Sequence, residues 1–431
     1  MYSLKRELKL NNKEVSLMRG CSGFKRWVYN WALKLVKASW EFKDIKASDA
    51  KRLDAAKKIF TNQVMQRPEY TWMKEYPSTI YQSAFQALKE AFSRWRKGLG
   101  EMPVFKQKRK GDSFTVYKTA GVYPEKGKPA LPFTNRVVLS DKKIQLPGIK
   151  QNFRLKESIP YICASQTFTV SRSADRWFVS FALDAQKLPP LFHPKGKVGI
   201  DLGVKAFATL SDGTVVNSPS PMRKAKTKLG KLRWRKTLED SLTLRYRNKQ
   251  LGNSRLGIRK SNNAEKYYVR LARQQSRIAN QRQDFLHKTT TEIAKTYSVV
   301  RIEDLNVQGM IANHKLALAV SDCGFYEFRR QLDYKQAHYG YRLEVVDRWF
   351  PSSKTCSSCN HLQPMPLKER VFDCQRCGIK IDRDLNASIN LENAPEEKIG
   401  KAIPESNACG QVAADSPGRN RKKTSKKSNN G

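Results

Sequence analysis

Four cysteines near the C-terminal end of the chain form two CxxC pairs, Cys356/Cys359 and Cys374/Cys377, separated by fourteen residues. Two tight turns of this kind can bring four thiolates around one tetrahedral ion, as in a closed structural zinc site. Two disulfides, or four buried free cysteines, are the alternatives. The CxxC spacing favours one structural zinc ion per chain.

Two carboxylates lie in segments that read as buried strands. Asp201 is in the middle of the apolar run VGIDLGVK, and Glu303 directly follows the predicted strand Ser298–Ile302. A carboxylate in a buried strand is costly unless it is paired or binds a metal. The carboxyl end of a strand is also where α/β sheets present their chemistry. We therefore predict that both acids bind a divalent metal, with a structural role for Asp201 as the alternative.

A third acidic segment, IDRDLNASIN, follows the second CxxC pair and offers two candidates, Asp382 and Asp384. Both stand at the entry of a short helix-compatible run. If that helix starts near Asp384, Leu385 and Ile389 form an apolar pair against a sheet and Asp384 faces the neighbouring strands. A helix-capping role for either aspartate is the alternative.

Composition points to a polyanionic partner. The chain has 431 residues, 82 Lys and Arg against 39 Asp and Glu, and a formal net charge of +43. An excess of this size favours nucleic acid as the partner, and a secreted cationic protein or a ribosomal protein is the alternative. No P-loop or Rossmann glycine motif supports ATP or NAD chemistry. There is no apolar run long enough for a membrane span and no signal-peptide core, and the remaining cysteines show no pairing pattern, which fits a reducing cytoplasm.

The N-terminal half combines strand and helix patterns. Residues 1–12 alternate apolar and charged side chains, which is typical of a β-strand, and residues 13–102 repeat apolar residues at helical steps. The aromatic residues of these helices are predicted to form a core. Short strand patterns in 103–190 end in a hairpin that turns at Ser173–Arg176. We expect a small β-barrel from residues 1–12 and 103–190, with the helical domain inserted.

The C-terminal half is predicted to be a nuclease domain. The strand with Asp201 and the hairpin after it resemble the opening of the ribonuclease H-like (RuvC-type) fold, which we assign to 195–349 and 381–395, interrupted by the zinc ribbon at 350–380. Residues 222–296 read as basic helices that track a phosphate backbone, with a solvated charged face as the alternative. Residues 396–431 are predicted to be a disordered basic tail. The basic residues crowd the start of the helices: Arg223, Lys224, Lys226, Lys228, Lys231, Arg233, Arg235 and Lys236.

Five blocks of the sequence together resemble the TnpB family, which is encoded by small bacterial insertion sequences and is ancestral to the type V CRISPR effectors. The resemblance is dense over residues 195–395 and looser in the N-terminal half. The blocks are GIDLGVK, VVRIEDLNVQGM, KLALAVSDCGFYEFRRQLDYKQAHYG, VDRWFPSSKTCSSC and CQRCGIKIDRDLNASIN.

This resemblance implies a multidomain α/β protein with a wedge β-barrel, a helical recognition domain, a RuvC nuclease domain and a zinc-bearing target-strand module. The implied activity is RNA-guided cleavage of double-stranded DNA beside a short flanking motif, with a guide RNA from the element's own end. Motif mapping places the catalytic acids on Asp201, Glu303 and Asp384, with Asp382 as a rival for the third. Such acids would hold two magnesium ions about 4 Å apart. A guided repressor that does not cut, and a transposase acting on element ends, are the alternatives.

Overall fold

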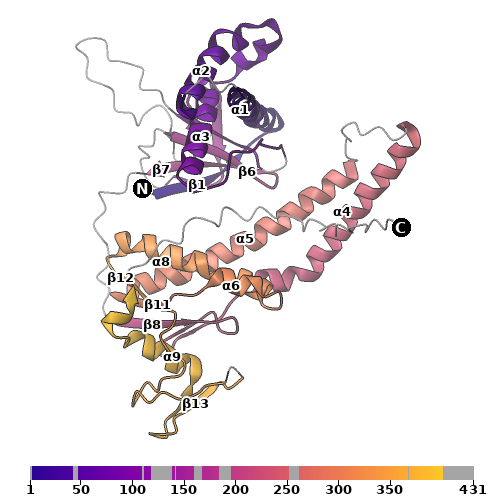
Figure 1. Cartoon of the computed structure of the whole chain (residues 1–431). Helices are drawn as coiled ribbons and strands as arrows, with labels where there is room; N and C mark the ends of the chain where they lie inside the picture. Colours follow the sequence, from indigo (N-terminus) through magenta and orange to yellow (C-terminus); the bar gives the residue numbers. More distant parts are fainter. Residues whose placement is uncertain are drawn as a thin grey trace, which may run out of the picture. The chain divides into compact units, whose positions relative to one another are not determined.

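The computed structural model describes residues 2–41, 47–108, 111–117, 138–140, 142–159, 167–183, 196–251, 262–366 and 368–400. The described residues form two compact units, one within residues 2–172 and 177–183 and the other made of residues 173–176 and 196–400. Figure 1 shows the elements of both units.

The first unit contains a seven-stranded sheet with the order β2-β6-β7-β1-β5-β4-β3. The predicted opening strand, β1, is confirmed and lies in the middle of this sheet, antiparallel to both β7 and β5. Within the described residues β2 and β3 are the two edge strands of the sheet. Closure of this sheet into a barrel therefore stays a prediction. The strands are β1 (Tyr2–Lys9), β2 (Ser113–Tyr117), β3 (Val138–Ser140), β4 (Lys143–Gln145), β5 (Asn152–Leu155), β6 (Thr167–Ser173) and β7 (Arg176–Leu183).

The predicted helical insertion lies between β1 and β2. It begins with a capping box, in which the Asn11 side chain accepts a hydrogen bond from the Glu14 N–H (2.9 Å) and the Glu14 carboxylate accepts one from the Asn11 N–H (2.7 Å). Phe24 and Phe60 are fully buried, so the prediction that the aromatic residues form a core is confirmed. The helices are α1 (Asn12–Ser39), α2 (Asp49–Asn62) and α3 (Ser78–Arg96), with 3₁₀ segments at Val64–Gln66 and Pro68–Glu75.

The second unit contains a six-stranded sheet with the order β10-β9-β8-β11-β12-β15. Strands β8, β11 and β12 are parallel neighbours, whereas β9, β10 and β15 run antiparallel to the strands beside them. The strands are β8 (Lys197–Leu202), β9 (Ala208–Leu210), β10 (Val215–Val216), β11 (Val299–Glu303), β12 (Arg342–Val346) and β15 (Ile399–Gly400).

The prediction of a disordered tail from residue 396 is wrong for its first residues. A 3₁₀ turn at Glu396–Lys398 leads into β15, whose Ile399 pairs with Val346 of β12. The open edge of β12 offers unpaired backbone groups, and two residues without a strand pattern are enough to pair with them. The rest of the predicted tail, from residue 401, lies outside the described residues.

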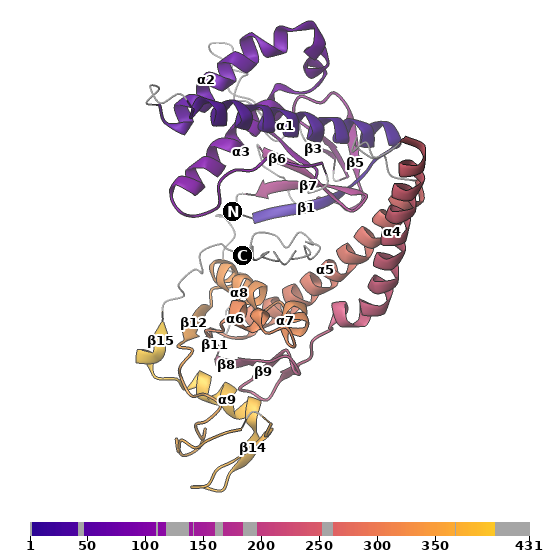
Figure 2. The ribbon, with the colours of Figure 1, turned by 45° about the vertical axis from the view of Figure 1, so that its right-hand side comes forward.

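Helices cover both faces of this sheet. Val198, Ile200, Val300 and Ile302 are buried in one core with residues of α5 and α8, whereas α9 packs on the opposite face. Figure 2 shows α5 and α8 on one side of β8 and α9 on the other. The predicted basic helical segment is confirmed as α4 and α5. The helices are α4 (Pro221–Leu251), α5 (Asn262–Thr296), α6 (Val307–Ala312), α7 (Ala317–Cys323), α8 (Phe325–Tyr339) and α9 (Arg383–Glu392).

Helix α9 lies directly on the backbone of β8. A side chain at Gly199 would place its Cβ 2.0 Å from the carbonyl oxygen of Ser388, so only glycine allows this approach. The Arg301 side chain then reaches past the end of the helix and donates to the carbonyl oxygens of Glu392 (2.9 Å) and Ala394. Both contacts fix the position of α9 on the sheet.

Candidate active site and metal centre

Three of the predicted acids, Asp201, Glu303 and Asp384, line one hollow of about 510 Å³. Strands β8 and β11 are parallel, and their register pairs Ile200 with Ile302, so the next residue on each strand is an acid. Because side chains alternate along a strand, both acids point to the face opposite these isoleucines, which is the face that α9 covers. Asp384 reaches the same hollow from the first turn of α9.

Asp382 has a different position. It is exposed, and its side chain accepts hydrogen bonds from the N–H groups of Asp384 (2.9 Å) and Leu385 (3.1 Å), which makes it the N-cap of α9. It does not line the hollow. The capping role that the sequence left open for either acid therefore belongs to Asp382.

The predicted packing face of α9 is wrong. Leu385 and Ile389 are only half-buried, because α9 contacts β8 through its backbone at Gly199 and turns its amides toward the cysteine segment. The buried residues are Asn386, Ala387, Ser388, Asn390 and Leu391.

The electrostatic environment of the hollow disfavours negative charge. Burial, and then repulsion by Asp384 and Glu303, raises the pKa of Asp201 to about 7. Burial and the neighbouring Asp304 also raise the pKa of Glu303, although Arg348 opposes this shift. Within the described residues, neither Asp201 nor Glu303 accepts a side-chain hydrogen bond or forms an ion pair. Both carboxylates are therefore available to a cation.

Asp304, beside Glu303, is already neutralised. Arg329 and Arg348 each form an ion pair with its carboxylate at 2.6 Å. Burial acts to raise the pKa of Asp304, but the hydrogen bonds from these two arginines hold it below its ordinary value. Of the two adjacent acids in the sequence EDL, Glu303 is the one available for chemistry.

The carboxylates do not converge on one point. Among the residues that the structure describes, only the four cysteines bring three or more ligand atoms close enough for a single ion. Carboxylates without a cation repel one another, and two ions about 4 Å apart need oxygen ligands spread around the hollow. Carboxylate oxygens are the ligands that Mg²⁺ prefers, so the residues present fit that ion in kind.

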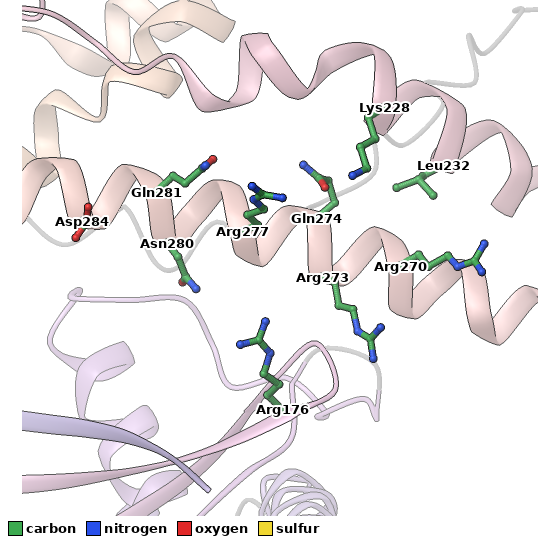
Figure 3. Close-up of a pocket in the computed structure, with 10 residues that line it drawn as sticks. All are labelled: Arg176, Lys228, Leu232, Arg270, Arg273, Gln274, Arg277, Asn280, Gln281 and Asp284. Atoms are coloured by element: carbon green, nitrogen blue, oxygen red, sulfur yellow. The ribbon is translucent and has the colours of Figure 1, made fainter. Parts of the chain in front are cut away.

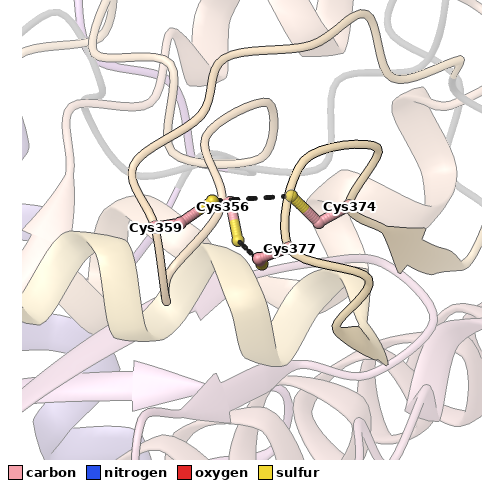
Figure 4. A group of neighbouring side chains, drawn as sticks. All are labelled: Cys356, Cys359, Cys374 and Cys377. Carbon is pink, nitrogen blue, oxygen red and sulfur yellow. Dashed lines mark hydrogen bonds between the residues drawn. The ribbon is translucent and has the colours of Figure 1, made fainter.

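The four cysteines of the CxxC pairs form a compact cluster (Figure 4). Their sulfur atoms lie within 4.8 Å of one another, with 3.6 Å between Cys356 and Cys377 and between Cys359 and Cys374. A disulfide needs about 2.05 Å, whereas tetrahedral zinc with bonds of about 2.3 Å separates its sulfurs by about 3.8 Å. The cluster therefore fits zinc and excludes disulfides.

Two matched turns build this cluster. The N–H of Asn360 donates to the carbonyl of Cys356 (3.0 Å), and the N–H of Gly378 donates to the carbonyl of Cys374 (2.9 Å). Asn360 and Gly378 each directly follow a CxxC pair and have φ angles of 58° and 72°. Asparagine and glycine are the residues that most readily adopt this conformation. The ribbon is completed by β13 (Val371–Asp373) and β14 (Lys380–Asp382).

The cysteine ribbon is tied to the helix that carries Asp384. The Asn386 side chain accepts a hydrogen bond from the Ser357 N–H (2.9 Å) and donates one to the Thr355 carbonyl (2.7 Å). Asn390 donates to the same Thr355 carbonyl (2.6 Å). The first CxxC turn therefore helps to fix α9, and with it the third acid.

The raised pKa of Asp201 predicts a pH-dependent stability. Because the folded pKa is about 7 against an ordinary 3.8, the folded state holds this proton more tightly, and the contribution to stability is lost as pH rises between these values. In EDTA, Asp201→Asn should raise the free energy of unfolding at pH 8 by on the order of 2 kcal/mol and change little near pH 4. Thermal melts at both pH values test this. An equal change at both would contradict it.

A basic groove lies between α4 and α5, and the sequence prediction named one of its cations, Lys228, but not the arginines of α5. Lys228 of α4 and Arg270, Arg273 and Arg277 of α5 line a hollow of about 700 Å³ (Figure 3). The arginines repeat at three- and four-residue steps, which places them along one side of α5. That spacing was the available signal, but the three arginines lie outside the denser cluster of cations in 223–236 on which the sequence prediction rested and which contributes Lys228 to the lining.

These features define the class of the protein: it is a multidomain α/β protein in which a cysteine ribbon adjoins an acidic hollow. Two family models match the chain: "Probable transposase" over residues 180–314 and "Cas12f1-like, TNB domain" over residues 325–391. A Streptomyces pristinaespiralis protein named "Putative RNA-guided DNA endonuclease" is 30% identical over 380 residues, covering 88% of this chain and 84% of that protein. The mimivirus TnpB-like protein L770 is 24% identical over 245 residues, covering 55% and 45% of the two chains. The chain belongs to the TnpB family.

A solved structure shares the fold. The chain aligns with the protein in the cryo-EM structure of a Cas12f1-sgRNA-target DNA complex with a TM-score of 0.52 and 15% sequence identity, covering 90% of this chain and 84% of that one. None of the helices in the described ranges is long and apolar enough to cross a membrane.

Proposed function

We propose that this protein is an RNA-guided, divalent-metal-dependent DNA endonuclease of a transposable element. The observation that carries the proposal is the hollow lined by Asp201, Glu303 and Asp384, where two carboxylates have raised pKa values and form no ion pair among the described residues. Burying such groups is costly unless a cation binds them. The name of the Streptomyces relative supports the same activity.

The sheet supports a ribonuclease H-like assignment for the second unit. Strand β8 is followed by the antiparallel strands β9 and β10, and β11 and β12 extend the sheet in parallel on the other side of β8. This arrangement places Asp201 and Glu303 at the carboxyl ends of neighbouring parallel strands, where open α/β sheets present their functional groups. The polypeptide supplies the third acid from α9, immediately after the ribbon.

Each acid would hold magnesium through its carboxylate oxygens. Bound magnesium ions would activate a water and stabilise the leaving oxygen of a phosphodiester. Arg383 forms an ion pair with Asp384 at 3.2 Å, and Arg370 approaches the same carboxylate at 3.9 Å, so both help to orient it within the hollow. The cysteine cluster would hold one structural zinc ion, which fixes the first CxxC turn against α9.

The basic groove between α4 and α5 would bind a phosphate backbone. Base pairing between a guide RNA and the target strand would read the DNA sequence, while the protein binds backbones and reads a short flanking motif. Lys and Arg side chains bind the phosphates of RNA or DNA by displacing condensed counterions, and this binding does not depend on the base sequence. We place the guide RNA or its DNA hybrid in this groove, because its lining includes five cations, Arg176 among them, and only one carboxylate, Asp284.

Replacing Lys228, Arg270 and Arg277 together with glutamine should make nucleic-acid binding less salt-dependent. Each lost phosphate contact lowers the slope of log K against log salt by about 0.7 to 0.9, so the slope should fall by about 2. Binding of the co-purifying RNA across a salt series measures this. Arg342 and Lys380 are matched controls, because carboxylates already pair with them at 2.7 and 3.0 Å. An unchanged slope in the triple variant would mean that this face is merely solvated.

The proposed function is tested with the RNA that co-purifies with the protein. Sequencing that RNA identifies the guide segment, and a duplex matching it is then offered with magnesium or EDTA. Cutting that needs both the RNA and the divalent ion supports the proposal. Guided binding without cutting would instead identify a repressor, and RNA-independent cutting at element ends would identify a transposase.

A further inference from the structure

Trp349 is the most exposed of the large apolar side chains in the described residues, at 84% of its accessible surface. It lies between β12 and the first cysteine, and it lines the same hollow as Asp201, Glu303 and Asp384. A tryptophan has a large apolar surface, and burying it would be favourable in free energy; an exposed tryptophan lacks this stabilisation. An aromatic ring held at an acidic hollow therefore suggests a ligand with a flat apolar face.

Hydrogen bonds hold the backbone around Trp349. The Asp347 carboxylate accepts a hydrogen bond from the Trp349 N–H (2.7 Å), and the Asp347 carbonyl accepts one from the Phe350 N–H (3.0 Å). On either side, Arg348 pairs with Asp304 at 2.6 Å and Phe350 packs inward. A side chain on an ordered backbone loses less entropy when a ligand stacks on it than one on a mobile segment. The residues around Phe350 are Val346, Leu391 and Ala394.

The surroundings of the ring are suited to a sugar-phosphate chain. Lys205, Lys354 and Arg370 are exposed and line the same hollow. These cations are well placed for phosphates, while Trp349 offers the only exposed aromatic face in this lining. Aromatic side chains combined with cations along a groove are the typical arrangement of a single-strand nucleic-acid site.

We propose that Trp349 is a stacking platform for one base of the strand that is cut, and that it fixes the neighbouring phosphodiester beside the three acids. The strand must be single there, because in a duplex the neighbouring base pairs cover the faces of each base. Stacking accepts any base, so the platform adds no sequence preference to that of the guide. This inference rests on the proposed nuclease function.

The test uses the full chain in complex with its co-purified RNA and compares Trp349→Ala, Trp349→Phe and Leu362→Ala. Leu362 is the matched control, because it is an exposed apolar residue of the ribbon (59%) that does not line the hollow. One readout is the single-turnover rate of cutting a guide-matched duplex. The second is photo-crosslinking of a short oligodeoxythymidine that carries 5-iodouracil, with calcium replacing magnesium, followed by peptide mapping.

Stacking predicts that Trp349→Ala slows cutting by about 5- to 100-fold and loses the crosslink to the peptide containing position 349. Trp349→Phe should keep both readouts within about threefold, because a smaller ring still stacks. Leu362→Ala should match the wild type. Wild-type cutting by Trp349→Ala, or a wild-type protein that forms no crosslink in this peptide, would overturn the platform. Failure of the wild type to cut any matched duplex would overturn the nuclease proposal, while the crosslink still tests the platform.

Discussion

Alanine at Asp201, Glu303 or Asp384 is expected to abolish cutting of a guide-matched duplex while guided binding of the same duplex persists. The three carboxylates are the only acidic side chains among the described residues that line this hollow, so under the proposed function each loss removes a metal ligand and not a contact to the guide. We expect the single-turnover cutting rate to fall by at least about a thousandfold, a loss of about 4 kcal/mol in transition-state stabilisation. Binding of the duplex by the same complex should change by less than about threefold.

Asp382→Ala is the matched control, since it removes an acid only two residues from Asp384. Asp382 caps α9 through two backbone N–H groups, so its loss should cost about 1 kcal/mol of stability and leave cutting largely intact. A variant with alanine at 384 that still cuts, or one with alanine at 382 that does not, would overturn the assignment of the third acid.

Replacing Cys374 with serine should release zinc and lower cutting more than RNA binding. Zinc sites of this kind contribute about 10 kcal/mol or more to the folding of small modules, and the buried core of the ribbon contains little besides Cys356, Phe372 and Cys374. Without the ion the first CxxC turn loosens, and with it the hydrogen bonds that Asn386 forms to hold α9. The third acid then loses its position, although the basic groove between α4 and α5 is unaffected.

Zinc content, cutting rate and RNA affinity of the same preparation test this expectation. Ser358→Ala is the control, because it changes an exposed residue inside the same CxxC turn without removing a ligand. Freshly purified protein that lacks zinc would contradict the metal assignment. A Cys374→Ser variant that cuts at the wild-type rate would contradict the link between the ribbon and the acids.

The sequence predicted the elements around the acids because their signals are local. Two CxxC pairs, an acid within an apolar run and long helical periodicity each depend on neighbouring residues. The comparisons confirm membership of the TnpB family, and the geometry brings together the acids that the motifs selected. Their catalytic role stays a prediction until the variants are measured.

Features that depend on contacts across the fold were missed. Leu385 and Ile389 were expected to pack on the sheet, but the close approach of α9 depends on Gly199 of β8, which lies far away in sequence. The pairing of β15 depends on the open edge of β12. The exposure of Trp349 depends on Phe350 packing inward against α9 and on Arg348 pairing with Asp304.

Reprogramming the guide provides the decisive measurement. The guide segment of the co-purifying RNA is exchanged for an unrelated sequence, and the rebuilt complex is offered two duplexes that differ only in the target and share its flanking sequence. We predict that cutting moves completely to the duplex that matches the new guide, requires magnesium, and is absent from the Glu303→Ala complex. Cutting that stays on the original duplex, or that persists without RNA, would contradict an RNA-guided nuclease.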